Sequence, residues 1–303
     1  MARYSDTAVI IPCKDEAIAI GKVVQDFKKN LPGCTVYVYD NNSVDNTAEE
    51  GKKAGAIVGF EPRPGKGNVV RRMFSEIEAD VYVMVDGDDT YDPQAAPRIV
   101  EAVKNHFDMV VGTRSGALEK HERSGHALGN SMFNSLYRLS LGQEFSDIFS
   151  GYRGFSRRFV KSFPALSQGF EIETELSAHA SQLRLPVTEI ATQYSNRAEG
   201  SESKLSTFKD GARILKTIVV LMKEYKPLYF FGFIGFCGAL FSIALFLPVF
   251  LEYRQNPNVS LIPTAVLSTG IMIVSMLSAT AGVILDSLRR FRAEVKRMFY
   301  NNS

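Results

Sequence analysis

Two long stretches without a charged residue, near the C-terminal end, constrain the fold of this chain more than any other feature. They run from Pro227 to Leu251 and from Gln255 to Leu285. Each is longer than the ~20 residues that a helix needs to cross a bilayer. Each is also hydrophobic on all sides rather than along one stripe. Two buried core helices are the alternative, but length and uniform hydrophobicity favour two membrane spans.

Basic residues flank this hydrophobic pair on both outer sides. Lys216, Lys223 and Lys226 precede the first stretch, and Arg289, Arg290, Arg292, Lys296 and Arg297 follow the second. Because positive charge is enriched on the cytosolic side of membrane proteins, we predict spans at 227–251 and 261–286, an outer connection at 252–260 and a basic cytosolic tail at 287–303. Both termini are then cytosolic, as in a bacterial inner-membrane protein.

Two further features concern the membrane. The segment 206–226 is amphipathic, which favours a helix lying along the membrane surface, with a core helix as the alternative. Small residues such as Gly235, Ser275 and Gly282 occur in both spans. They allow close helix approach, so a homo-oligomer is one expectation.

The first 205 residues alternate between short apolar runs and segments with helical spacing. We predict strands at 7–12, 35–39, 56–60, 81–86, 109–112 and 187–194, and helices at 16–31, 47–54, 68–78, 97–105, 127–141, 171–183 and from 155 to 163. Such alternation predicts an α/β fold with a mostly parallel sheet and right-handed crossovers. Ligands of these sheets bind at the carboxyl ends of the strands.

Three carboxylates follow the apolar run 81–85 directly, at Asp86, Asp88 and Asp89. Acids at the end of a buried strand are costly unless they meet a cation. Their hard oxygen atoms suit Mg²⁺ or Mn²⁺ carrying a diphosphate. A turn with solvated acids is the alternative.

Several other classes of function are disfavoured. A net charge of +2 argues against a general nucleic-acid binder. The three cysteines lack metal-site spacing and fit a reducing compartment. Residues 59–67 lack the spacing of a phosphate loop, residues 121–126 miss the HExxH zinc spacing, and the first strand lacks a GxGxxG turn. Metal-assisted nucleotide chemistry remains.

Six motifs, in order over about residues 7–210, resemble those of family 2 glycosyltransferases. The likeness is to the polyprenyl-phosphate glycosyltransferases that include dolichyl-phosphate mannose synthases. The matching segments are 9–12 with Asp15 and Glu16, 40–47, 65–67, 86–88, Asp147 with 150–153, and the late loop from Arg197 to Leu205. Two departures stand out: Asp15 replaces the usual Asn, and Thr90 replaces a Gln metal ligand, for which Asp89 could substitute.

The resemblance implies a cytosolic GT-A nucleotide-sugar-binding domain at 1–205 that transfers a hexose, with inversion, to a polyprenyl phosphate. A UDP-sugar such as UDP-glucose or UDP-N-acetylglucosamine is the favoured donor, and GDP-mannose is the alternative. Transfer to another lipid acceptor and a non-catalytic nucleotide-sugar binder are further alternatives. A processive polysaccharide synthase is disfavoured because its acceptor motif needs a tryptophan and the chain has none.

The resemblance also implies roles for individual residues. The implied nucleotide-sugar ligands are Pro12, Glu16, Asp40, Asn41, Lys66, Asp86, Arg197 and Lys204; the metal ligands for Mg²⁺ or Mn²⁺ are Asp86, Asp88 and Asp89; the acceptor-phosphate ligands are Arg123, His126 and Arg153; and the catalytic carboxylates are Asp147 and Glu173. Asp147 could act as a base or as a loop anchor, and the sequence leaves both open. A phosphate monoester, with a second pKa near ~6, can attack without a strong base.

Overall fold

The computed structural model describes residues 3–115, 145–165, 169, 171–195, 219–220, 222–255 and 260–302 of the 303-residue chain. The chain divides into two compact units. The first combines Met1–Ser206 with Val295–Ser303, and the second is Thr207–Glu294.

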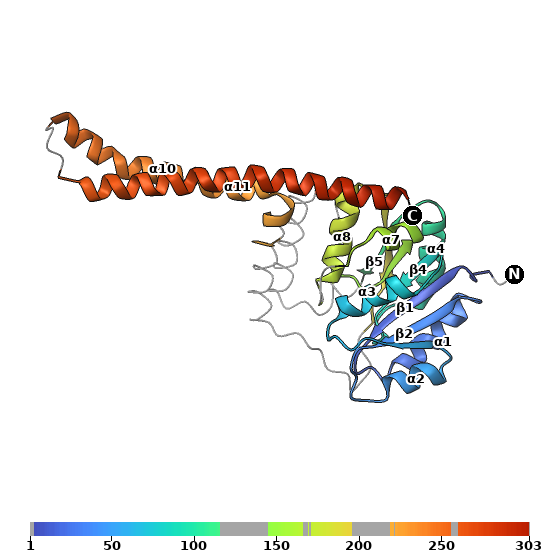
Figure 1. Ribbon diagram of the computed structural model, residues 1–303. Helices are drawn as coiled ribbons and strands as arrows, with labels where there is room; N and C mark the ends of the chain where they lie inside the picture. The colour runs from blue at the N-terminus through green and yellow to red at the C-terminus, as the bar shows by residue number, and fades with distance from the viewer. Residues whose placement is uncertain are drawn as a thin grey trace. The chain divides into compact units, whose positions relative to one another are not determined.

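A seven-stranded sheet forms the centre of the first unit (Figure 1). Its strands are β1 Thr7–Cys13, β2 Thr35–Asp40, β3 Ile57–Phe60, β4 Val81–Met84, β5 Met109–Ser115, β6 Arg153–Ser156 and β7 Val187–Gln193. The spatial order is β3-β2-β1-β4-β6-β5-β7. Only β6 runs antiparallel to its neighbours β4 and β5 among the strands that the structure describes. The predicted mostly parallel α/β fold is therefore confirmed.

Helices connect these strands, as the alternating pattern predicts. They are α1 Ile20–Asn30, α2 Thr47–Lys53, α3 Lys66–Glu76, α4 Ala96–Lys104 after the 3₁₀ turn Pro93–Ala95, α7 Arg157–Ser162 and α8 Ile172–Leu183. In α1 the buried residues are Ile20, Val23, Val24 and Phe27. This spacing places them on one face of the helix, where they join the apolar core under β1 and β2.

Strand β6 differs from the sequence prediction, which began a helix at residue 155. The structure has a four-residue strand followed by α7, which Ser156 caps by accepting a hydrogen bond from the Phe159 N–H at 3.2 Å. Within β6, a side chain at Gly154 would collide with Ile99 of α4. A strand this short, carrying an arginine and a glycine, lacks the apolar alternation that identifies strands from sequence.

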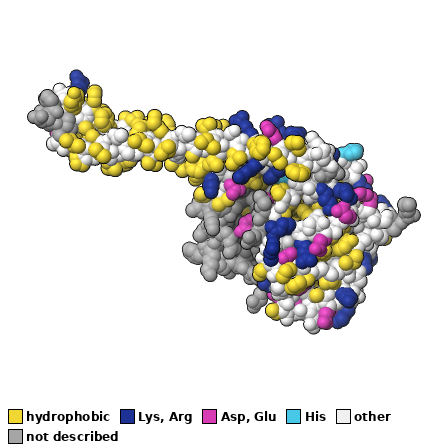
Figure 2. Space-filling view, viewed as in Figure 1, with side chains coloured by type: hydrophobic (Ala, Val, Ile, Leu, Met, Phe, Trp, Pro, Cys, Tyr) yellow, Lys and Arg dark blue, Asp and Glu magenta, His cyan; other side chains and the backbone are white. Residues whose placement is uncertain are grey.

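The second unit contains the two apolar stretches as long helices. They are α10, Pro227–Gln255, and α11, Ile262–Asn301, whose last turns belong to the first unit. Only 17% of the most apolar window of each helix is buried, and Figure 2 shows hydrophobic side chains along both. Both are long and apolar enough to cross a membrane, and their exposure argues against two core helices.

Small and hydroxylated residues bring α10 and α11 together. A Cβ added at Gly235 would lie 2.7 Å from the Ser275 carbonyl oxygen. The Ser242 hydroxyl donates to the Ser268 carbonyl at 2.6 Å. Close approach of small residues therefore holds within the hairpin; self-association between chains stays a prediction.

Candidate active site

The turn after β1 is bound to the loop after β2. Asp15 has a φ of 52°, a left-handed conformation that Asp tolerates better than most residues. Its N–H donates to the Ser43 hydroxyl at 2.9 Å, and its carboxylate accepts from the Val44 N–H at 2.8 Å. Next along the turn, the Glu16 N–H donates to the Thr47 hydroxyl at 2.8 Å. These bonds join the first two motifs into one frame at the carboxyl edge of the sheet.

Asn41 shapes the loop that precedes α3. Its side chain is buried, and its amide nitrogen donates to the carbonyls of Glu61 and Arg63 at 2.9 and 2.8 Å. Its amide oxygen accepts from the Gly65 N–H at 2.7 Å. Because these bonds occupy both ends of the amide, the geometry favours a positioning role that presents Lys66; the predicted nucleotide contact of Asn41 stays a prediction.

Lys66, the first residue of α3, lies between two acids from distant parts of the chain. Its ammonium is 2.5 Å from Asp86 Oδ1, beyond the end of β4, and 2.5 Å from Glu173 Oε1, in the first turn of α8. The exposed fractions of the Lys66 and Glu173 side chains are 10% and 5%. Predicted sugar-nucleotide, metal and catalytic residues therefore meet at one point.

Burial and charge act in opposite directions on this lysine. Burial alone would lower the Lys66 pKa, but the charges of Asp86 and Glu173 raise it above its ordinary value. Burial also raises the Glu173 pKa, against the attraction of Lys66. Glu173 Oε2 is buried and has no hydrogen-bond partner among the described residues, and the same holds for Asp40 Oδ1. Such atoms need a partner, and a bound substrate or ion could supply it.

The acids that follow β4, Asp86, Asp88 and Asp89, form hydrogen bonds with different partners. Asp88 is buried and its Oδ1 accepts from the Thr90 hydroxyl at 2.6 Å. Asp89, with a φ of 59°, binds Lys22 at 2.7 and 2.8 Å. Thr90 therefore supports Asp88, while Asp89 is paired with a lysine of α1.

Asp86 and Asp88 fit a divalent ion by the chemistry of their donor atoms. Both carry hard carboxylate oxygens at the ligand-binding edge of the sheet. The described residues contain no group of three or more histidines, cysteines or acids that could hold a metal. Magnesium commonly takes one or two carboxylates, with phosphates and water completing its shell. The pair suits that kind of site, and the assignment of metal ligands stays a prediction.

Gly151 lies against the carboxylate of Asp86. A Cβ added there would be 2.5 Å from Asp86 Oδ2, and the Gly151 N–H donates to the Tyr91 hydroxyl at 2.9 Å. Only a residue without a side chain fits this approach. Gly151 lies within a sequence motif, but nothing in the sequence indicates its contact with Asp86.

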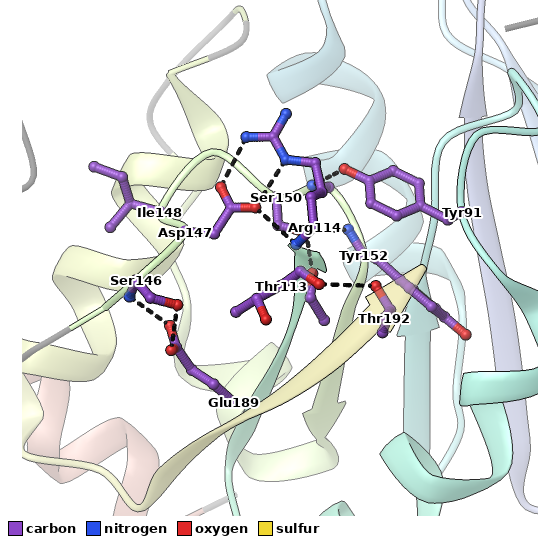
Figure 3. Close-up of polar contacts among 12 residues, drawn as sticks. Tyr91, Thr113, Arg114, Ser146, Asp147, Ile148, Ser150, Tyr152, Glu189 and Thr192 are labelled. Carbon is purple, nitrogen blue, oxygen red and sulfur yellow. Dashed lines mark hydrogen bonds and ion pairs between the residues drawn. The ribbon is translucent and has the colours of Figure 1, made fainter. Parts of the chain in front are cut away.

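Asp147 forms a bidentate ion pair with Arg114, which lies at the end of β5 (Figure 3). The Arg114 Nε and Nη2 each donate at 2.8 Å to one carboxylate oxygen, and the Arg114 N–H donates at 3.2 Å. The guanidinium carbon also lies 5.6 Å from the ring centre of Tyr194. Burial would raise the Asp147 pKa, but Arg114 lowers it overall. A carboxylate held this way is a weak base, so the geometry favours the loop anchor over the general base.

Neighbouring contacts hold the same loop, residues 145–152, in place. Ser146 donates through its N–H and hydroxyl to Glu189 of β7, at 2.8 and 2.6 Å (Figure 3). The Ser150 hydroxyl donates to the Gly112 carbonyl at 2.5 Å. The loop is thereby fixed to β5 and β7 on one side and lies beside Asp86 on the other.

Arg153 was predicted to bind the acceptor phosphate, and its position favours a different role. The residue is fully buried. Its guanidinium donates to the carbonyls of Ser150 and Ile148, at 2.8 and 2.6 Å, and to the Ser177 hydroxyl at 2.8 Å. Arginine is the cation best suited to such a network of buried acceptors. Phosphate binding by Arg153 would require it to leave these partners.

The remaining predicted residues divide into two groups. Pro12 is buried in β1 opposite Tyr39 of β2, and Glu16 is half-buried in the turn after β1. Arg123, His126, Arg197 and Lys204 lie outside the residues that the structure describes.

The mostly parallel sheet with acids at its carboxyl edge fits the GT-A type of fold, and sequence comparison gives the family. The profile of glycosyl transferase family 2 matches residues 8–163. The chain is 31% identical over 297 residues to the glycosyltransferase AglJ of Haloferax volcanii, which covers 96% of each chain. It belongs to glycosyltransferase family 2, as the motifs predict.

A second relative and a solved structure extend this comparison. The dolichyl-phosphate hexose transferase of Haloferax volcanii is 28% identical over 222 residues, covering 73% of this chain and 96% of the relative. Glucosyl-3-phosphoglycerate synthase from Mycobacterium tuberculosis, in complex with Mn²⁺, UDP-glucose and phosphoglyceric acid, superimposes with a TM-score of 0.54. That match has 21% identity and covers 72% of this chain and 78% of the other. At this identity the likeness concerns the fold alone.

Proposed function

We propose that the protein transfers a hexose from a nucleotide-diphosphate sugar to a polyprenyl phosphate at the cytosolic face of a membrane, with inversion and with a divalent ion. One observation carries this proposal: a family 2 domain with an acidic site at its sheet edge is followed in the same chain by two exposed apolar helices. A site for a water-soluble donor thus accompanies an anchor suited to a lipid acceptor.

The state of the two predicted catalytic acids supports a phosphate acceptor. Arg114 binds Asp147, and Lys66 binds Glu173. Asp147 is therefore poorly placed to remove a proton from a hydroxyl group, and Lys66 occupies one oxygen of Glu173. A phosphate monoester is already largely dianionic at neutral pH, because its second pKa is near ~6. Its attack needs alignment and charge neutralisation more than a base.

Asp86 and Asp88 would hold the divalent ion. When bound, Mg²⁺ or Mn²⁺ would stabilise the negative charge that develops on the departing nucleotide diphosphate. Gly151 keeps space beside Asp86, and Thr90 orients Asp88.

The acceptor class and the topology draw on separate observations. The dolichyl-phosphate hexose transferase of Haloferax volcanii is a relative over 73% of this chain. The last turns of α11 contact the catalytic unit, since the Tyr300 hydroxyl donates to Asp108 at 2.8 Å and Lys296 donates to Gln182 at 3.0 Å. Because these contacts lie within the first unit, they support a catalytic domain and a C-terminal tail on the same side of the membrane, as two spans would leave them.

A UDP-sugar remains the favoured donor, with GDP-mannose as the alternative. Glucosyl-3-phosphoglycerate synthase, which shares the fold, was solved with UDP-glucose, and at 21% identity that likeness leaves the donor of this chain open. Discrimination among hexoses depends on hydrogen bonds to individual sugar hydroxyls. The sugar therefore has to be identified by experiment.

The test is transfer from a panel of radiolabelled UDP- and GDP-sugars to undecaprenyl phosphate by the full chain in detergent. It is run with Mn²⁺ or Mg²⁺ and with a chelator. Labelled lipid from one donor, lost with chelator, is the expected result. Nucleotide binding without product from any donor would contradict the proposal and favour a non-catalytic binder. Product only with a lipid carrying a free hydroxyl would replace the phosphate acceptor.

A further inference from the structure

The ion pairs of Lys66 bear on how the metal site works. The ammonium is shared between Asp86, a predicted metal ligand, and Glu173, which lies 107 positions further along the chain. A lysine carries three donor hydrogens on a flexible stem and acts as a compact point charge. It can therefore change partners by rotating its side chain while the backbone of α3 stays in place.

We propose that Lys66 is an internal counter-ion of the metal site, which neutralises Asp86 until a divalent ion binds and then moves fully onto Glu173. This inference rests on the metal dependence in the proposed function. It makes Glu173 a positioning residue whose task is to withdraw the lysine from the metal carboxylates.

Repulsion between charges supplies the reason for the movement. An ammonium in contact with Asp86 lies close to any divalent ion that Asp86 binds. The Lys66 side chain is only 10% exposed, so little water screens the two positive charges. Binding of the ion would therefore displace the ammonium from Asp86.

Glu173 offers the displaced ammonium a second contact. Its Oε1 already accepts from Lys66, and its Oε2 is buried without a hydrogen-bond partner among the described residues. A carboxylate accepts hydrogen bonds through both oxygens. Movement of Lys66 onto both would satisfy the buried Oε2 and release Asp86.

The inference predicts opposite effects for the two partners of this ion pair. In Lys66→Gln the competing cation is lost, so we expect the free protein to bind Mn²⁺ at least about tenfold more tightly, because one charge contact that water screens poorly changes a binding constant by tenfold or more. In Glu173→Gln the ammonium has only Asp86 as an anionic partner, so we expect Mn²⁺ affinity to fall about tenfold. Lys66→Arg keeps the positive charge and should not bind Mn²⁺ more tightly than the wild type.

The experiment is a direct titration of the full chain in detergent with Mn²⁺, without nucleotide. Electron paramagnetic resonance measures the concentration of free Mn²⁺ at each step. Lys53→Gln is the matched control, because Lys53 is an exposed lysine of α2 that pairs with Glu50 and the substitution removes the same charge. We expect the control to bind Mn²⁺ as the wild type does. Circular dichroism of each variant identifies any that fails to fold, and Glu173→Gln, which keeps the lysine and the shape of its partner, provides the second variant.

The outcomes separate this inference from the proposed function. Unchanged or weaker Mn²⁺ binding by folded Lys66→Gln would overturn the counter-ion role while leaving the metal-dependent transfer standing. Mn²⁺ binding of Glu173→Gln equal to that of the wild type would also overturn it. A wild-type protein that binds no Mn²⁺ while transferring sugar in the presence of chelator would remove the metal from the proposed function, and the counter-ion role with it.

Discussion

Two polar clusters around acidic side chains in the described part of the first unit differ in how completely the protein satisfies the acids. Asp108, which precedes β5, is fully buried and accepts from the Ser156 hydroxyl, from two nitrogens of Arg158 and from the Tyr300 hydroxyl. At the carboxyl edge, Asp86 and Glu173 share one lysine.

We interpret this difference as one between an acid that serves the fold and an acid that can still bind a ligand. A buried carboxylate whose lone pairs all meet protein donors contributes to the fold and has little capacity for a ligand. A buried carboxylate such as Glu173, one oxygen of which has no hydrogen-bond partner among the described residues, can still bind a substrate hydroxyl, an ion or a lysine that moves toward it. Asp147, bound by Arg114 through both oxygens, resembles Asp108 in this respect.

The largest effect is expected at Asp88. Asp88→Ala should reduce sugar transfer by at least about a hundredfold, since it removes a predicted ligand of the ion that stabilises the leaving group. Circular dichroism should show a folded protein. The matched variant is Asp89→Ala, whose carboxylate pairs with Lys22, and we expect a much smaller loss. Equal losses in the radiolabel assay would place Asp89 back among the metal ligands.

Asp108 tests the other cluster. Asp108→Ala leaves Arg158 and Tyr300 without their shared partner, and we expect a loss of about 3 kcal/mol in stability. Thermal unfolding followed by circular dichroism measures this loss, and the KM for the donor should not change. Glu78→Ala, which breaks only exposed ion pairs with Arg157 and Lys161, should shift the midpoint little. A raised KM in Asp108→Ala would contradict the division between structural and functional acids.

The fold and the acidic edge were predictable because their signals are local. The apolar runs of β1 and β4 and the acids that follow β4 are continuous in sequence, and parallel strands bring such ends together. The partners of those acids are not local. Lys66 and Glu173 are 107 positions apart. Their contact depends on tertiary packing, which residue periodicity does not encode.

Arg153 and Asp147 show the same limit in another form. Sequence places both in a motif but cannot tell whether a charged side chain faces a ligand or the interior. Burial decides this: Arg153 is fully buried among carbonyl groups, and Asp147 meets Arg114 from 33 positions away. A motif therefore predicted where charged residues gather more reliably than what each one contacts.

The ion pair of Asp147 and Arg114 gives an intermediate effect. Asp147→Asn and Arg114→Gln should each reduce transfer about tenfold by loosening the loop beside Asp86, and the double variant should be no worse than the more damaged single variant.

Because Arg114 lowers the Asp147 pKa, the ion pair stabilises the fold above about pH 4, and this contribution is lost as pH falls through the lowered pKa. The pH dependence of transfer near neutrality should therefore keep its shape in Asp147→Asn. If the wild-type pH profile of transfer instead shows a titrating base that is missing from the profile of Asp147→Asn, Asp147 is the base.

The smallest effect is expected at His179, which tests whether a buried atom without a hydrogen-bond partner is enough to mark a functional site. His179 lies in α8 between Phe159 and Phe163, and its Nδ1 has no hydrogen-bond partner among the described residues. Burial lowers its pKa to about 3. The folded protein therefore binds fewer protons here than the unfolded chain, whose histidine titrates near ~6.5. Stability is full above that value and falls with pH below it, by roughly 1 kcal/mol between pH 7.5 and 6.

In His179→Phe this part of the pH dependence of thermal unfolding should disappear, while transfer at pH 7.5 stays at the wild-type rate. A loss of transfer at pH 7.5 in the folded variant would instead indicate that His179 takes part in the reaction.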